Sequence, residues 1–227
     1  MKILPTKVID NFFSDEDFRY LKSLPFVYSH MNHATDYDPI FEYKPYLKDQ
    51  LPLGLVRRYL SFNDHPDYSK VTKILNETVE KHFGTDIKIR ASHILTAFYP
   101  YLTHTDAVYG EYGIDDTNFG AYTLIIPLDT FLSSTIIYNE YSDKTKVTSV
   151  YMEDHEPINK IDDEFYEKYL THEARENMRY LSVEKVFNWN SNSCLAMSRY
   201  KFHGSDDFFS HGIPYKQALI MWTSAHY

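Results

Sequence analysis

The chain has little cysteine, no long hydrophobic run and no excess of basic residues, and each shortage excludes a class of protein. The single cysteine, Cys194, excludes an internal disulfide and is typical of a reducing compartment. No apolar segment reaches the length that a transmembrane helix needs. The net charge of −9 argues against stable binding of duplex DNA or RNA, because such binding relies on Lys and Arg neutralising phosphates.

The composition favours a single compact domain over residues 1–227. A hydrophobic content of 43% is ample for a core, and 21 tyrosines and 15 phenylalanines favour strands and aromatic-lined pockets. Residues 1–11 are too polar for a signal peptide. We therefore expect a cytoplasmic protein that binds neither membranes nor nucleic acids stably. The sequence predicts no oligomeric state.

Hydrophobic periodicity predicts many short strands. Strands are expected over residues 8–13, 87–98, 122–128, 135–138, 181–187, 194–203 and 216–223. Residues 29–60 have no clean period and predict irregular structure with short edge strands. A helix is expected from an N-cap at Ser14 to a stop at Pro25. A second helix is expected over residues 69–83, with Gly84 as its C-cap.

The order of these elements predicts a mainly β, α+β protein with a jelly-roll core and supporting N-terminal helices. The core is expected over about residues 87–138 and 181–225. Residues 139–180 are charged and helix-prone, so they are expected to form a helical insertion. Long insertions at barrel mouths often bind ligands, and we expect this one to form a lid or rim over the site.

His104 and Asp106 lie two residues apart between two apolar runs. Side chains two residues apart on an extended strand point to the same side, so these two can hold one ion. A second match, His65-Pro66-Asp67, contains a proline that disfavours an interior strand, and we interpret it as a turn. A lone His-x-Asp is weak evidence without its structural context.

A second histidine would complete a set of two histidines and one carboxylate, the arrangement typical of non-haem Fe(II) oxygenases. The later histidines that compete for this role are His155, His172, His203, His211 and His226. The first two lie in the expected insertion, where a surface histidine is the usual explanation. His203 closes an apolar run at a strand end, whereas His211 lies in a loop.

Lys216 favours His203 over His211. If 2-oxoglutarate is the cosubstrate, its distal carboxylate needs a cation at the start of a strand neighbouring that of the second histidine. His203 precedes Lys216 by thirteen residues, which is room for a loop and a return strand, whereas His211 precedes it by five. Fe²⁺, one carboxylate ligand, the 2-oxoglutarate dianion and Lys216 together are neutral, which avoids an unpaired buried charge.

Four stretches resemble the 2-oxoglutarate- and Fe(II)-dependent oxygenases, particularly small ones found in phages and marine bacteria. They are residues 8–14, residues 98–106 with His104 and Asp106, residues 181–189, and residues 199–223 with His203 and Lys216. The last stretch agrees best in residue types and spacing. The chain has Ser191-Asn192-Ser193 where the family often has glycine, and Ser198 where it often has aspartate.

The resemblance implies a double-stranded β-helix that uses Fe(II), 2-oxoglutarate and O₂. It implies that His104, Asp106 and His203 bind the iron and that Lys216 binds 2-oxoglutarate. Tyr99, Tyr122 and Arg199 are further candidates for holding the cosubstrate or substrate. The expected reaction is hydroxylation of a small molecule or a protein side chain, with 2-oxoglutarate converted to succinate and CO₂.

Two other classes remain open at the level of sequence. One is a cupin-like jelly-roll module that binds a metal or a sugar without oxidation. The other is a metal hydrolase, because the same ligand types suit Zn²⁺. The family resemblance to phage proteins would place the protein in the cytoplasm of a bacterial cell, infected by a phage in the case of the phage members.

Overall fold

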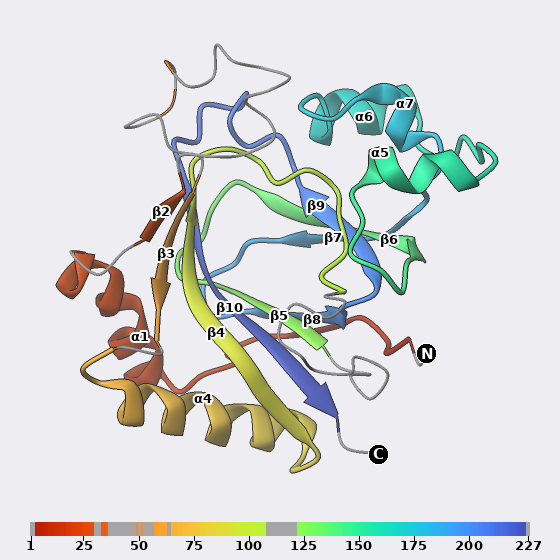
Figure 1. The fold of residues 1–227 in the computed structure, drawn as a ribbon. Helices are drawn as coiled ribbons and strands as arrows, with labels where there is room; N and C mark the ends of the chain where they lie inside the picture. Colours follow the sequence, from red (N-terminus) through yellow and green to blue (C-terminus); the bar gives the residue numbers. More distant parts are fainter. Residues whose placement is uncertain are drawn as a thin grey trace.

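The computed structural model describes residues 3–29, 33–35, 49, 51, 57–62, 65–107 and 122–225. Their strands form two antiparallel sheets that face one another (Figure 1). The large sheet has the order β1-β8-β5-β10-β4-β3-β2 and the small sheet the order β7-β6-β9. The expected mainly β, jelly-roll architecture is confirmed. No helix among these residues is both long enough and apolar enough to span a bilayer.

The strand bounds are close to those expected for most of the chain. The strands are β1 (Lys7–Ile9), β2 (His33–Thr35), β3 (Arg57–Ser61), β4 (Ile87–Ala97), β5 (Tyr122–Pro127), β6 (Ser134–Tyr141), β7 (Val183–Asn188), β8 (Cys194–Ser198), β9 (Lys201–Ser205) and β10 (Lys216–Ala225). Two short strands, β2 and β3, form the expected edge of the large sheet, and the rest of 29–60 lies largely outside the described residues.

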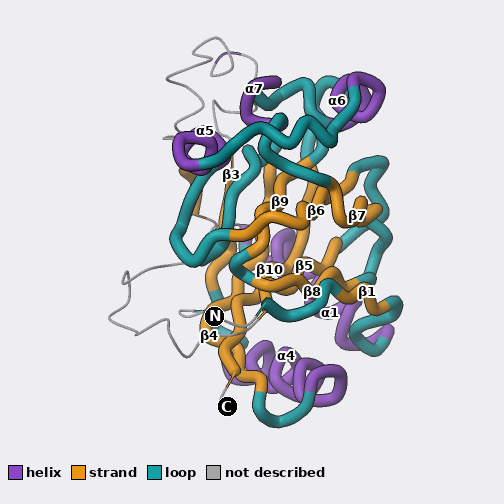
Figure 2. The backbone as a smooth tube through the Cα atoms, turned by 90° about the vertical axis from the view of Figure 1, so that its right-hand side faces the viewer, coloured by secondary structure: helices purple, strands orange, loops and turns teal. Residues whose placement is uncertain are grey.

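Two N-terminal helices, α1 (Asp15–Val27) and α4 (Tyr68–Phe83), cover the outer face of the large sheet (Figures 1 and 2). Ser14 caps α1 as expected, since its hydroxyl accepts the amide of Asp17. The expected stop at Pro25 is wrong, because α1 continues to Val27. A proline in the last turn removes one donor only, and the amide of Tyr28 still reaches the carbonyl of Leu24.

Helix α4 confirms its predicted apolar stripe. Val71, Ile74, Leu75 and Val79 are all buried in the main core against the large sheet. Gly84 ends the helix with a φ of +88°, a left-handed value that glycine adopts without steric cost.

Strand β5 contributes to two cores because its side chains alternate between the two faces of the large sheet. Tyr122, Leu124 and Ile126 pack on the side of α1 and α4. Ile125 packs on the inner side with Trp189 of the connection after β7. This alternation decides which residues of the large sheet face the space between the two sheets.

The apolar run 194–203, expected as one strand, is two strands in different sheets. Strand β8 pairs with β1 and β5 in the large sheet, and β9 pairs with β6 in the small sheet. The chain changes sheet at Arg199 and Tyr200, which form a turn. His203 therefore lies in the middle of β9, not at a strand end. An apolar run that is buried throughout carries no mark of this corner, because both strands are equally hydrophobic.

The segment 139–180 contains the expected helices. They are α5 (Thr148–Tyr151), the 3₁₀ turn η4 (Met152–Asp154), α6 (Asp163–Tyr169) and α7 (Arg175–Met178). They lie beyond the small sheet, on the side of the molecule opposite α1 and α4 (Figures 1 and 2). Leu170 and Met178 are buried in one cluster with Tyr138 of β6 and Phe202 of β9. The segment therefore supports the outer face of the small sheet.

We predict that Leu170→Ala destabilises the whole protein. Leu170 is fully buried, so its truncation leaves a cavity beneath β6 and β9 and should cost about 2–5 kcal/mol of unfolding free energy. Urea denaturation measures this cost, with Lys160→Ala as an exposed control that should change stability by less than about 0.5 kcal/mol. Equal stability of the two variants would mean that the segment does not support the sheet.

Candidate metal centre

A backbone bridge brings the two histidines together. His104 and His203 form an isolated antiparallel bridge in which each amide donates to the other residue's carbonyl, both at 2.9 Å. Directly opposed residues of an antiparallel pair project their side chains to the same face. The two imidazole centroids lie 4.6 Å apart. The loop after β4 is thereby joined to the edge of the small sheet, ninety-nine positions later in the sequence.

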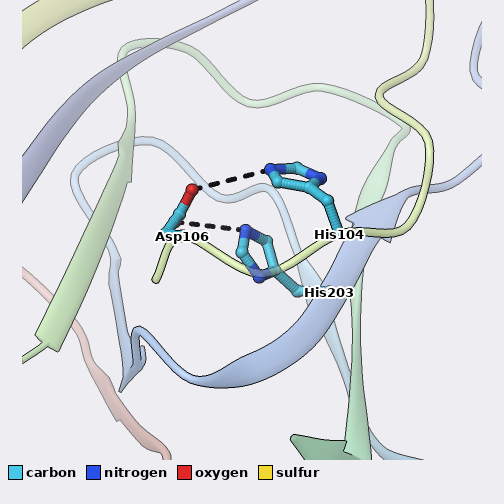
Figure 3. Close-up of side chains that lie close together, drawn as sticks. All are labelled: His104, Asp106 and His203. Carbon is cyan, nitrogen blue, oxygen red and sulfur yellow. Dashed lines mark ion pairs between the residues drawn. The ribbon is translucent and has the colours of Figure 1, made fainter. Parts of the chain in front are cut away.

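Asp106 completes a cluster of three side chains that point toward one another (Figure 3). Its carboxylate oxygens lie 3.6 Å from His104 Nε2 and 3.4 Å from His203 Nε2. One donor atom from each of the three residues lies within 4.8 Å of the others, which suits a shared metal ion. No other set of three or more His, Cys, Asp or Glu residues in the described part of the chain has this geometry.

Carbonyl groups orient both imidazole rings. His104 Nδ1 lies 2.7 Å from the carbonyl oxygen of Leu102, and His203 Nδ1 lies 3.1 Å from that of Lys201. A carbonyl only accepts, so each Nδ1 carries a hydrogen, and Nε2 is the ring nitrogen that faces the cluster. This is the arrangement by which a neighbouring acceptor usually fixes a metal-binding histidine.

Thr123 and Arg199 hold Asp106. The Thr123 hydroxyl donates to Asp106 Oδ2 at 2.7 Å. The Arg199 guanidinium donates twice to the Asp106 carbonyl, at 2.8 and 3.2 Å, and the Asp106 amide donates to the Arg199 carbonyl. Although burial raises the pKa of Asp106, the imidazoles of His203 and His104 hold it well below its usual range. The carboxylate is therefore ionised, as a metal ligand must be.

A cavity of about 130 Å³ lies between the sheets and includes all three cluster residues in its lining. Lys216 lines the same cavity, at the start of β10. None of the described lining residues comes from 139–180, so the expected lid over the site is not formed by the described part of that segment. The segment supports the site indirectly, because the buried Glu173 carboxylate accepts a hydrogen bond from the amide of Thr103, the residue before His104.

Lys216 is buried with three oxygen neighbours. Its Nζ donates to Ser133 Oγ at 3.1 Å and to the Ser134 carbonyl at 3.2 Å, and it lies 3.8 Å from Asp206 Oδ1. The last distance is too long for an ordinary hydrogen bond. An ammonium has three N–H donors, so one remains for a ligand in the cavity. Trp189 lies beneath the ammonium, with its ring centroid 4.1 Å away.

Lys216 reaches the cavity by a different route from the one expected. Strand β10 belongs to the large sheet between β5 and β4, whereas His203 lies on β9 in the small sheet. The two strands therefore face one another across the sandwich and are not paired neighbours. The connection from β9 to β10 crosses between the sheets, and residues 206–215 are long enough for this crossing.

The three further candidates do not line the cavity. Tyr99 packs with Leu51 and Phe209, and Tyr122 faces the helices on the other side of the large sheet. Arg199 holds the backbone of Asp106, as described above. The cavity residue on β5 is Thr123, the neighbour of Tyr122. The sequence signal for Thr123 was a polar residue within an apolar run. The face of β5 on which Thr123 lies, however, follows only from the pairing of the strands.

The competing histidines lie elsewhere. His155 stacks on Tyr151 at 3.7 Å, and His211 is exposed. His172 is buried, not on the surface as expected, because the insertion packs on the small sheet. His226 lies outside the described residues. The motif His65-Pro66-Asp67 forms the expected turn, in which Asp67 accepts hydrogen bonds from Tyr20 and Tyr28.

Solved structures share this fold at low sequence identity. The epimerase SnoN, in complex with Fe3+, alpha ketoglutarate and nogalamycin RO, matches with a TM-score of 0.54 at 10% identity, covering 97% of this chain and 78% of its own. The alpha-ketoglutarate-dependent carbocyclase SnoK gives 0.56 at 9% identity, covering 97% and 79%. EctD from S. alaskensis, with 2-oxoglutarate and 5-hydroxyectoine, gives 0.54 at 11% identity, covering 97% and 72%.

These matches confirm that the chain has the double-stranded β-helix fold of 2-oxoglutarate- and iron-dependent enzymes, as the sequence resemblance implied. No protein-family model matches the sequence, and no curated protein matches it significantly.

We predict that Gly204→Ala weakens metal binding. A Cβ at Gly204 would lie 2.8 Å from Thr103 Oγ1 and 3.1 Å from Thr103 Cα, so the segment carrying His104 would have to move away from β9. Overpacking of this kind costs about 1–3 kcal/mol, which should appear in the calorimetric affinity for Mn²⁺ or Zn²⁺. Gly84→Ala, far from the cluster, should leave that affinity unchanged. Equal affinities in both variants would contradict this account.

Proposed function

We propose that the protein is a 2-oxoglutarate- and Fe(II)-dependent oxygenase that hydroxylates a small molecule. The observation that carries this proposal is that one cavity has both a possible metal site and a buried cation in its lining. The cluster of His104, Asp106 and His203 lies in its lining together with a buried lysine that has a donor to spare. Iron and a dicarboxylate cosubstrate would each have a site of suitable chemistry within the same cavity.

The donor set suits Fe(II). Two imidazole nitrogens and one carboxylate oxygen occupy three positions of an octahedron and leave three for other ligands. Asp106 is the residue whose absence would leave room for a halide, so its presence favours hydroxylation over halogenation. Because both rings donate through Nδ1 to the carbonyls of Leu102 and Lys201, the Nε2 atom of each ring is the one that would bind the iron.

The cavity also suits 2-oxoglutarate. The remaining N–H of Lys216 would donate to the distal carboxylate, and the small hydroxyl-bearing Thr135 and Ser205 line the cavity beside it. Asp206 was not anticipated from the sequence and adds one negative charge to an otherwise neutral set. Burial raises the pKa of Asp206, which works against this additional negative charge.

Each side chain then has a defined part in the reaction. His104, His203 and Asp106 would hold the iron, Arg199 and Thr123 would fix the position of Asp106, and Lys216 would orient the cosubstrate. Iron with 2-oxoglutarate and O₂ supplies the oxidising power for attack on a C–H bond, with release of succinate and CO₂. Leu95, Ile125 and Ile220 give this space apolar walls.

The structural neighbours support a small-molecule substrate. SnoN was solved with nogalamycin RO and EctD with 5-hydroxyectoine, both of which are small compounds. The competing classes, a metal- or sugar-binding jelly roll and a zinc hydrolase, give no reason for a buried cation in the same cavity. Lys216 is therefore the observation that favours the oxygenase.

We predict a weak visible charge-transfer band when Fe(II) and 2-oxoglutarate are added without O₂. His203→Ala should abolish the band because a ligand is lost, whereas His211→Ala, which changes an exposed histidine, should retain it. Succinate release in the presence of O₂ then tests turnover. Absence of the band in the unmodified protein would exclude the oxygenase, and its persistence in His203→Ala would exclude His203 as a ligand.

We predict that the affinity for 2-oxoglutarate falls as the pH rises through about 8. Burial lowers the pKa of Lys216 to about 8, so the side chain is cationic below this pH and loses its charge above it. Lys216→Arg should remove this dependence, because a guanidinium stays protonated. Asp206 raises the pKa of Lys216, so Asp206→Asn should move the midpoint to lower pH.

Calorimetric titration of the Zn²⁺-loaded protein with 2-oxoglutarate at several pH values measures this effect. An unchanged pH dependence in Lys216→Arg would show that another group controls cosubstrate binding.

A further inference from the structure

The cavity has a second end, six residues along β10 from Lys216. Lys216 and Trp222 occupy even positions on the strand and both line the cavity, so they lie on the same face about 20 Å apart along it. The protein has two tryptophans, and they belong to opposite ends. Trp189 lies at the Lys216 end, while Trp222 pairs in register with Thr123, which holds Asp106.

Three aromatic rings form a continuous wall at the Trp222 end. His93 contacts Tyr59 edge-on with ring centroids 5.2 Å apart, and it contacts Trp222 edge-on at 5.4 Å. All three residues line the cavity. Flat rings arranged in this way favour a flat or ring-shaped apolar ligand, because stacked and edge-on contacts both become available.

Trp222 has a buried indole N–H with no hydrogen-bond partner among the described residues. The Trp189 N–H, in contrast, donates to Thr135 Oγ1 at 2.8 Å. Buried polar groups without a partner are rare, and each one requires an explanation. A ligand that carries an acceptor oxygen would satisfy the Trp222 donor.

Apart from the candidate metal cluster, this end of the cavity has no charged side chain in its described lining. In the described lining, the charged side chains are those of Asp106 and Lys216, and both already have a part in the proposed function. Burial lowers the pKa of His93 to about 4, so its imidazole is neutral and keeps one donor and one acceptor. An ionised group placed against the aromatic wall would lose its hydration without gaining a charged side chain as a partner.

We propose that the wall of Tyr59, His93 and Trp222 is the substrate subsite and that it takes an uncharged, flat ring bearing an acceptor oxygen such as a carbonyl. This inference rests on the proposed function, which places 2-oxoglutarate at the opposite end. It excludes free amino acids, sugar phosphates and nucleotides from the part of the substrate that enters the cavity.

The two indole N–H groups report on the two ends separately. In the full-length Zn²⁺-loaded protein labelled with ¹⁵N at the indole, a nitrogen–proton correlation spectrum gives one peak for each tryptophan, assigned with Trp189→Phe and Trp222→Phe. Adding 2-oxoglutarate should move the Trp189 peak. If it does not, the proposed function fails, and the substrate subsite is judged separately from the Trp222 peak.

Benzamide, benzoate and toluene are then titrated as matched probes. Benzamide and benzoate have the same shape but differ in charge, and toluene has the ring without an acceptor. Benzamide should bind saturably and move the Trp222 proton downfield, the direction of a new hydrogen bond. Toluene should bind about fivefold more weakly, and benzoate should leave the Trp222 peak in place.

Trp222→Phe keeps the ring and removes the donor. In this variant, calorimetry should show benzamide losing its advantage over toluene, while the Trp189 peak still reports on 2-oxoglutarate. A Trp222 peak that does not respond to benzamide, or that responds equally to benzoate, would overturn the proposal. So would an undiminished preference for benzamide over toluene in Trp222→Phe.

Discussion

The two backbone hydrogen bonds between His104 and His203 are the constraint on which the candidate site depends. They join a loop that leaves the large sheet to the edge strand of the small sheet. The side chains then converge without further adjustment, because opposed residues share a face. The close approach requires Gly204 beside Thr103, and the helical segment behind it holds Thr103 in place through Glu173. The shape of the candidate metal cluster is thus set by main-chain pairing.

Sequence patterns predicted those features that depend only on residue type and on local hydrophobic periodicity. The residues His104, Asp106, His203 and Lys216 were chosen by type and spacing, and the structure places all four around one cavity. The helix over 69–83 and its glycine cap follow from a 3.6-residue stripe. Each of these inferences uses information from a short stretch of chain.

Features that depend on which strands pair were not predictable. Tyr122 and Thr123 are adjacent, yet the choice between them depends on which face of β5 meets the helices. The corner at Arg199 interrupts an apolar run with no change in hydrophobicity. Asp206 acquires its importance from the approach of Lys216 across the sandwich, ten positions later in the chain. Register and sheet membership are long-range properties, and a single sequence records them weakly.

The segment from Thr103 to Asp106 also bears on how the protein matures. Four consecutive amides in this segment donate to four separate places, namely Glu173, the His203 carbonyl, the Lys146 carbonyl and the Arg199 carbonyl. A nascent chain that has not yet reached residue 199 lacks two of these acceptors and one imidazole. The candidate metal cluster therefore comes together only when nearly the whole chain is available, so ion binding there would be a late event that favours the completed fold over partly folded states.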